Sequence, residues 1–194
     1  MRIGHMASDP VKRHWTVEEY LAYEEETGVK HEYLDGDIFA MSGGSGDHAL
    51  ITMNCGIEIG SQIRGSNCKA YSSDLKIKIS NNRYVYPDLS VVCGETQYAD
   101  DNNSILLNPI MVVEVISPSS ASYDRLQKSE YYRSLPSLQI YLILEQDKPF
   151  AQLWSRREDG WLLQDFSGLD ATLPLTAIDC TLPLSEVYRG VELS

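Results

Sequence analysis

The fold of this chain is decided by two stretches, Tyr84-Val-Tyr-Pro-Asp-Leu-Ser-Val-Val92 and Ile110-Met-Val-Val-Glu-Val-Ile116. Both are apolar, β-branched runs of the kind that forms buried strands. Each run carries one carboxylate, Asp88 in the first and Glu114 in the second. Because proline removes a donor from a sheet ladder, Pro87 predicts that Asp88 lies at a strand entrance or a bulge.

The two carboxylates predict a shared metal site. A carboxylate on a buried strand is costly unless a cation or hydrogen-bond donors compensate it. Asp88 and Glu114 are 26 residues apart, on strands that we expect to be neighbours, and their oxygens suit Mg²⁺ or Mn²⁺. With Lys128 from the following helical segment, they form the minimal set for metal-assisted phosphodiester hydrolysis. A turn-capping role for Asp88 and an arginine partner for Glu114 are the structural alternatives.

An ordered series of segments resembles a known family. Pro87-Asp88, Glu114-Val-Ile-Ser-Pro118, Asp124 to Lys128 and Tyr131-Tyr132 resemble the Uma-two family of restriction endonucleases, a family abundant in cyanobacteria. That family belongs to the PD-(D/E)XK nuclease superfamily. The resemblance extends over nearly the whole chain, and its further segments are Thr16-Val-Glu-Glu-Tyr20, Glu32-Tyr-Leu-Asp-Gly-Asp37, His48, Ser73-Asp-Leu-Lys-Ile-Lys78 and Gln139-Ile-Tyr-Leu-Ile143.

The resemblance implies an α/β fold with a restriction-endonuclease-like core: a helix, three strands, a helix and a strand, with a central mixed sheet and added β-hairpins. It also implies an endonuclease that needs Mg²⁺ or Mn²⁺ and cuts DNA. Asp88, Glu114 and the backbone carbonyl of Val115 would hold the metal, with Glu32 beside it in a catalytic or second-metal role. Lys128 would orient the attacking water. We expect a homodimer, since cutting both strands of a duplex calls for two related sites.

The position of the lysine departs from the superfamily pattern. That pattern has a lysine two residues after the glutamate, where this chain has Ile116. Lys128 on the following helix is the natural replacement, and Lys76 and Lys78 are its competitors. Lys128 could instead be a solvated helix residue paired with Asp124 at the i, i+4 spacing.

Other candidate residues also have ordinary structural roles. Glu32 would face solvent on a plain hairpin strand. His48, near a helix start, could face an anion, be satisfied in the core or act as a general base. Alternation puts Asp74, Lys76 and Lys78 on one strand face, a pattern that also protects an edge strand.

Turn and capping signals predict the remaining elements. Thr16 and Glu19 are in capping-box register and Gly28 is a stop signal, which predicts a helix from Thr16 to about Glu26. An Asp-Gly turn predicts a hairpin over Glu32 to Met41. The other expected elements, in order, are a hinge or lid loop over Ser42 to Gly46, a helix over Asp47 to Ile63, strands over Lys69 to Ile79, Tyr84 to Cys93 and Ile110 to Ile116, a helix over Tyr123 to Leu135, a strand over Gln139 to Leu144, a hairpin over Ala151 to Phe166 and a short helix over Leu184 to Tyr188.

Composition sets the outer limits. With 194 residues and 43% hydrophobic content, residues 6–194 are expected to form one domain, and Met1 to His5 resemble a cloning remnant. No apolar run or signal pattern suggests a membrane, so the expected location is the cytoplasm. The four cysteines show no C-x-x-C spacing and are expected to be reduced, partly buried thiols: Cys55, Cys68, Cys93 and Cys180.

The net charge of −12 opposes nucleic-acid binding, because phosphate contacts require cations. A metal would neutralise part of that charge, and the basic residues could gather on one side. We therefore expect weak, salt-sensitive, metal-assisted DNA binding. The competing functions are a non-catalytic binding module that keeps the nuclease scaffold, and a phosphodiesterase for RNA or small nucleotides.

Overall fold

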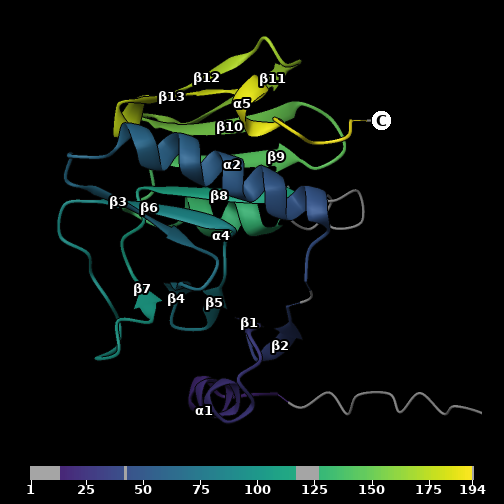
Figure 1. The fold of residues 1–194 in the computed structure, drawn as a ribbon. Coiled ribbons are helices and arrows are strands. Elements are labelled where there is room, and N and C mark those ends of the chain that lie inside the picture. Colours follow the sequence, from purple (N-terminus) through teal and green to yellow (C-terminus); the bar gives the residue numbers. More distant parts are fainter. Residues whose placement is uncertain (1–13, 42, 117–126, 194) are drawn as a thin grey trace, which may run out of the picture.

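The computed structural model describes residues 14–41, 43–116 and 127–193. Its centre is a six-stranded sheet with the strand order β11-β10-β9-β8-β6-β3 (Figure 1). Strands β8 and β9 are parallel and the other neighbours are antiparallel, so the sheet is mixed, as predicted. The strands are β3 (Cys68–Ser72), β6 (Leu89–Cys93), β8 (Met111–Ile116), β9 (Ile140–Glu145), β10 (Phe150–Arg157) and β11 (Gly160–Ser167).

Helices lie on both faces of this sheet. Helix α2 (Gly46–Gln62) crosses in front of it in Figure 1, and its buried residues pack in one core cluster with Val113. Helix α4 (Ser129–Arg133) lies behind, where Tyr132 packs with Val112 in a second cluster. Val112 and Val113 pack on opposite faces of the sheet because successive residues of a strand point to opposite sides. The order α2, β3, β6, β8, α4, β9 is the expected core of a helix, three strands, a helix and a strand.

A second, five-stranded sheet lies beside the first, below it in Figure 1, with the strand order β2-β1-β5-β4-β7. Helix α1 (Val17–Thr27) packs on it through Tyr20, which meets Tyr33 and Tyr84 in a small aromatic cluster. The strands of this sheet are β1 (His31–Leu34), β2 (Asp37–Ala40), β4 (Lys76–Ser80), β5 (Arg83–Val85) and β7 (Ile105–Leu106).

Two predicted strands are each divided between the sheets. The expected strand over Tyr84 to Cys93 is β5 followed by β6, and the expected strand over Lys69 to Ile79 is β3 followed by β4. In the first case Pro87 interrupts the ladder, because it has no backbone N–H to donate. Asp88 therefore lies at the point where the chain passes from the small sheet to the central one, a strand entrance as predicted.

The capped helix and both Asp-Gly hairpins are confirmed. Thr16 and Glu19 form the capping box of α1, and Gly28 ends it with φ +65°. The hairpins are β1–β2 and β10–β11. Of the predicted helix over Tyr123 to Leu135, residues 123–126 lie outside the described part. The sequence did not predict β7 or the small C-terminal sheet of β12 (Thr172–Leu175) and β13 (Cys180–Pro183), which lead into α5 (Leu184–Val187).

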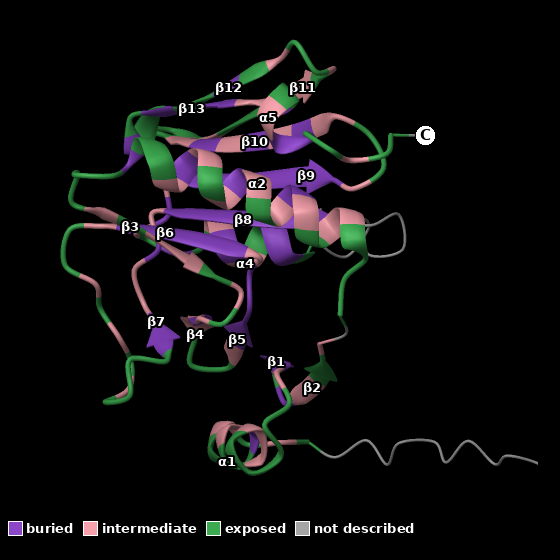
Figure 2. Ribbon diagram, viewed as in Figure 1, coloured by how far each residue is buried: buried purple, intermediate pink, exposed green. Residues whose placement is uncertain are grey.

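Burial is concentrated in the central sheet and under α2 (Figure 2). Strands β8 and β9 are buried along their full length, in agreement with the continuous apolar runs in their sequences. Among the described residues, no helix is both long and apolar enough to cross a membrane.

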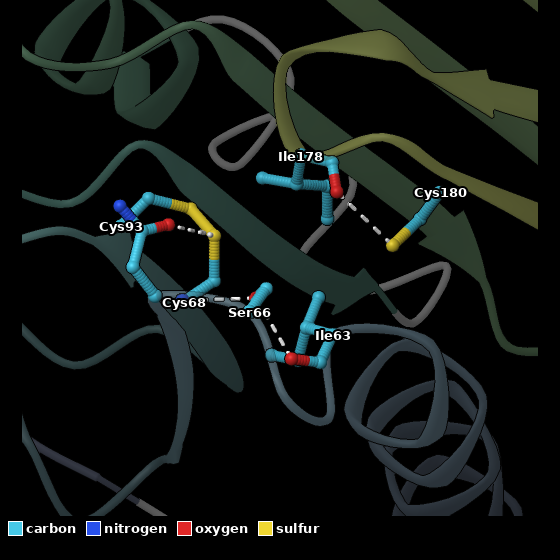
Figure 3. Close-up of a disulfide and its surroundings, with 7 residues drawn as sticks. Ile63, Ser66, Cys68, Cys93, Ile178 and Cys180 are labelled. Carbon is cyan, nitrogen blue, oxygen red and sulfur yellow. Dashed lines mark hydrogen bonds between the residues drawn. A yellow bond between two sulfur atoms is a disulfide. The ribbon is translucent and has the colours of Figure 1, made fainter.

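The expectation of four reduced thiols is wrong for two of them. Cys68 on β3 and Cys93 on β6 are register partners in adjacent antiparallel strands, and their sulfur atoms form a disulfide (Figure 3). Local C-x-x-C spacing could not reveal this pair, because the pairing depends on strand register. Cys55 and Cys180 are free and buried, as expected, and burial raises the pKa of the Cys55 thiol to about 12.

Candidate active site

The two strand carboxylates lie on neighbouring strands. Strands β6 and β8 pair in antiparallel register with Leu89 opposite Val113. Continued by one residue, that register sets Asp88 beside Glu114. The backbone N–H of Val115 donates to Asp88 Oδ2 at 2.7 Å, which ties the aspartate to the same strand as the glutamate.

Lys128 joins the predicted catalytic residues into one buried cluster. Its Nζ lies 2.8 Å from Glu32 Oε1 and 3.3 Å from Glu114 Oε1. The three side chains come from β1, β8 and the residue directly before α4, and the residues are 7%, 5% and 8% exposed. Burial of two carboxylates is tolerated here because one ammonium group contacts both. We name Glu32, Glu114 and Lys128 the ion triad.

Tyr132 and Tyr86 supply further hydrogen bonds to the ion triad. The hydroxyl of Tyr132 donates to Glu114 Oε1 at 2.9 Å, and the backbone N–H of Tyr86 donates to Glu32 Oε1 at 3.4 Å. Burial, with the Glu114 and Glu32 charges adding, raises the pKa of Tyr132 well above its ordinary value. The phenol therefore stays protonated and remains a donor to Glu114.

His48 holds the other oxygen of Asp88. Its Nε2 lies 2.9 Å from Asp88 Oδ1. The ring comes from the first turn of α2, where Ser45 caps the helix by accepting the His48 backbone N–H. Gly44 leaves room for the ring, since a Cβ at that position would lie 2.8 Å from it. Of the three roles considered for His48, the structure agrees with a histidine that faces an anion.

The competing lysines contact other groups. Lys76 is buried in an ion pair with Glu24, and its Nζ lies 4.7 Å from the centre of the Tyr20 ring. Lys78 lies over the ring of Tyr84 at 5.8 Å. The structure therefore brings Lys128 to Glu114, and its replacement of the superfamily's strand lysine stays a prediction.

Two further details differ from the expected pattern. Asp74 does not share a strand face with Lys76, because it lies in the turn between β3 and β4, where it pairs with Lys30. Asp124, the helical partner considered for Lys128, lies outside the described residues. Ile116, at the position of the superfamily lysine, is buried in the core with Tyr132.

The donor set fits a small, hard divalent cation. Asp88 and Glu114 would supply carboxylate oxygens from adjacent strands, and Val115, directly after Glu114, would supply a backbone carbonyl. Within residues 14–41, 43–116 and 127–193, no three His, Cys, Asp or Glu side chains are grouped to hold a metal. Mg²⁺ fits a site with only two carboxylates, because it commonly retains several of its waters.

Comparison with known proteins identifies the family. The family model Uma2, described as "Putative restriction endonuclease", matches residues 17–185. The chain belongs to the Uma2 family. Two relatives come from Synechocystis sp. One, uncharacterized protein slr1290, is 36% identical over 191 residues, covering 97% of this chain and 98% of the relative. Uncharacterized protein sll1609 is 31% identical over 160 residues, covering 81% and 90%.

A solved structure has the same fold. It is a putative nuclease belonging to DUF820 from Anabaena variabilis, with a TM-score of 0.73 and 19% identity over 90% of this chain and 97% of that one. At this identity the similarity is one of fold. Together with the Uma2 match, it supports a restriction-endonuclease-like architecture and a nuclease-like function at the level of the family.

Proposed function

We propose that this Uma2 protein is an endonuclease that hydrolyses DNA phosphodiester bonds and requires Mg²⁺ or Mn²⁺. The observation that carries the proposal is the buried ion triad beside Asp88. Its lysine comes from a different element than the superfamily pattern predicts, yet its Nζ reaches Glu114 at 3.3 Å. The same ammonium group contacts Glu32 at 2.8 Å, so two carboxylates and one cation are gathered beside Asp88.

Asp88, Glu114 and the carbonyl of Val115 would hold the metal. When bound, Mg²⁺ supplies Lewis-acid chemistry at the phosphoryl group. His48 contacts one Asp88 oxygen, and the Val115 N–H donates to the other. The Asp88 carboxylate is thus oriented before any ligand arrives, which reduces the reorganisation that binding requires.

Lys128 would act on the reacting phosphate. An ammonium group carries a positive charge and only donors, the chemistry that an attacking water or a phosphate oxygen accepts. In the transition state it would offset the negative charge that develops on the non-bridging oxygens. Glu32 would orient Lys128 through the 2.8 Å contact, and Tyr132 would orient Glu114.

A second candidate is a binding module that keeps the nuclease fold. The net charge of −12 favours it, because an acidic surface repels a DNA backbone. In addition, Lys128 neutralises part of the carboxylate charge of the ion triad, so the cluster depends less on a metal for its stability.

A cleavage assay separates these functions. Supercoiled, linear duplex and single-stranded DNA, alongside RNA, would be incubated with Mg²⁺, with Mn²⁺ and with a chelator. We expect metal-dependent cleavage of DNA by the parent and its loss in Asp88→Asn, which keeps the shape of the side chain but removes its charge. Cleavage of RNA alone would reassign the substrate, and no cleavage of any polymer would favour the binding module.

A further inference from the structure

A groove opens directly onto the Asp88–His48 pair. It runs between α2 and β3, the edge strand of the central sheet, and has a cavity volume of about 660 Å³. That volume is within the range of about 300–1,000 Å³ usual for small-ligand sites. We name it the α2–β3 groove; its lining residues include Lys30, His48, Met53, Ala70, Ser72 and Leu89.

The walls of the α2–β3 groove are mainly small or aliphatic. Its lining includes Ala49 and Met53 of α2, Ala70 of β3 and Leu89 of β6, and Gly56 contributes no side chain. Met53 is 62% exposed, so its side chain is accessible to a ligand in the groove. Such a surface suits a flat, weakly polar group, and it offers little to a phosphate backbone.

The basic residues argue against a long duplex footprint. Lys76 and Lys128 are buried in ion pairs, and Lys30 and Arg83 pair with Asp74 and Asp35. Arg133 and Arg156 stack on the rings of Trp154 and Trp161. Duplex binding depends on many cations that neutralise phosphates, whereas single strands gain much of their affinity from contacts to the bases.

We propose that the α2–β3 groove receives one unpaired nucleobase of the DNA strand whose phosphate lies at Asp88, so that the preferred substrate is single-stranded or locally unpaired DNA. The proposal rests on the proposed function for the identity of the neighbouring phosphate site. A paired base is stacked inside its duplex and has to leave the stack to enter a pocket of this size. The groove thus indicates which form of DNA the proposed endonuclease prefers.

Binding by fluorescence anisotropy tests the groove without relying on cleavage. The probes are a labelled thymidine oligonucleotide and a labelled blunt duplex, each with Ca²⁺ in place of Mg²⁺. We expect the parent to bind the single strand about tenfold or more tightly than the duplex, in keeping with the contribution of a single well-placed base contact. Equal or tighter binding of the duplex would overturn the proposal.

Two matched variants locate the binding. Met53 and Ile57 are exposed residues one turn apart on α2, 62% and 54% exposed, and of the two Met53 alone is among the groove residues. Met53→Glu should weaken single-strand binding about tenfold, while Ile57→Glu, with the same added charge, should change it less than about twofold. The uncharged changes should give the same result: Met53→Ser should weaken single-strand binding more than Ile57→Ser does.

Two controls keep the outcomes distinct. Circular dichroism should show equal folding of the variants, and Mn²⁺ calorimetry on Met53→Glu should match the parent. If the parent fails to bind Mn²⁺ but the Met53 effect on DNA binding remains, the proposed function fails and the groove stands. If Met53→Glu and Ile57→Glu weaken binding equally, or if Met53→Glu only dissociates a dimer in light scattering, the groove is not a nucleobase site.

Discussion

At the residue scale, the site depends on a lysine that reaches Glu114 from a different element of the fold. Lys128→Met removes the ammonium group while keeping much of the side-chain length. We expect cleavage to fall about 10²-fold or more, because a positioned electrostatic group is lost from the reacting phosphate. Single-turnover cleavage and Mn²⁺ calorimetry would show a slower reaction with metal binding largely kept.

Lys78, one of the two competing lysines, gives the control for the cleavage rate of Lys128→Met. Lys78→Met should leave cleavage near the parent rate, since Lys78 lies over Tyr84. If Lys78→Met abolished cleavage and Lys128→Met did not, the catalytic charge would have been assigned to the wrong element.

The positions of the two strand carboxylates were predictable, because charge on a buried apolar strand is rare enough to be informative, while their role in metal binding stays a prediction. Asp88 and Glu114 stood out in the sequence for that reason, and the absence of a lysine at Ile116 directed attention to Lys128. The contacts of His48 with Asp88 and of Tyr132 with Glu114 were not predictable. They depend on how α2 and α4 lie across the sheet, which no local pattern in the sequence records.

At the scale of elements, α1 is joined to the five-stranded sheet by the buried pair of Glu24 and Lys76, whose side chains are 9% and 7% exposed. Glu24 also accepts the backbone N–H of His31, the neighbour of Glu32, at 2.6 Å. Lys76→Met would leave a buried carboxylate without its cation and should destabilise the protein by about 3–5 kcal/mol. Urea denaturation measures this loss.

The pair of Arg83 and Asp35 in the same sheet is the matched control. Its side chains are 34% and 51% exposed, so Arg83→Met should cost no more than about 1 kcal/mol. Equal losses in Lys76→Met and Arg83→Met would mean that the Glu24 pair contributes no more than a surface ion pair does.

Elements marked by local chemistry were predictable, and elements set by tertiary packing were not. The capping box of α1 and the Asp-Gly hairpins depend on residues close in sequence. The division of residues 69–79 into β3 and β4 depends on which sheet each half joins. The polar residues Ser72 to Asp74 mark the turn between them, but alternation alone favoured one continuous strand. The disulfide between Cys68 and Cys93 was missed for a related reason, since it follows from register between β3 and β6.

At the scale of the whole molecule, buried tyrosines link stability to alkaline pH. Burial raises the pKa of Tyr20, Tyr86, Tyr132 and Tyr188 above the ordinary value. Since their folded pKa values exceed the unfolded value of about 10, this stabilisation is fully present below about pH 10 and is lost as the pH rises above it. We expect the urea midpoint to fall steeply above about pH 10.

Tyr188→Phe isolates one of these groups. Its hydroxyl donates to the carbonyl of Glu145 at 2.6 Å, so the variant loses some stability below about pH 10. Above about pH 10, however, its stability should fall less steeply than that of the parent, by up to about 1.4 kcal/mol per pH unit. Identical slopes would show that Tyr188 does not contribute to alkaline unfolding.

The most direct test of the account is calorimetric titration of the parent and of Asp88→Ala with Mn²⁺, because every proposed step depends on a metal held by Asp88 and Glu114. We expect one binding site in the parent and an affinity more than about 100-fold weaker in Asp88→Ala, beyond the loss usual for a residue that only supports a ligand. Asp170→Ala, at an exposed aspartate far along the chain, should bind like the parent. Binding of Mn²⁺ to Asp88→Ala as tight as in the parent would contradict the metal site.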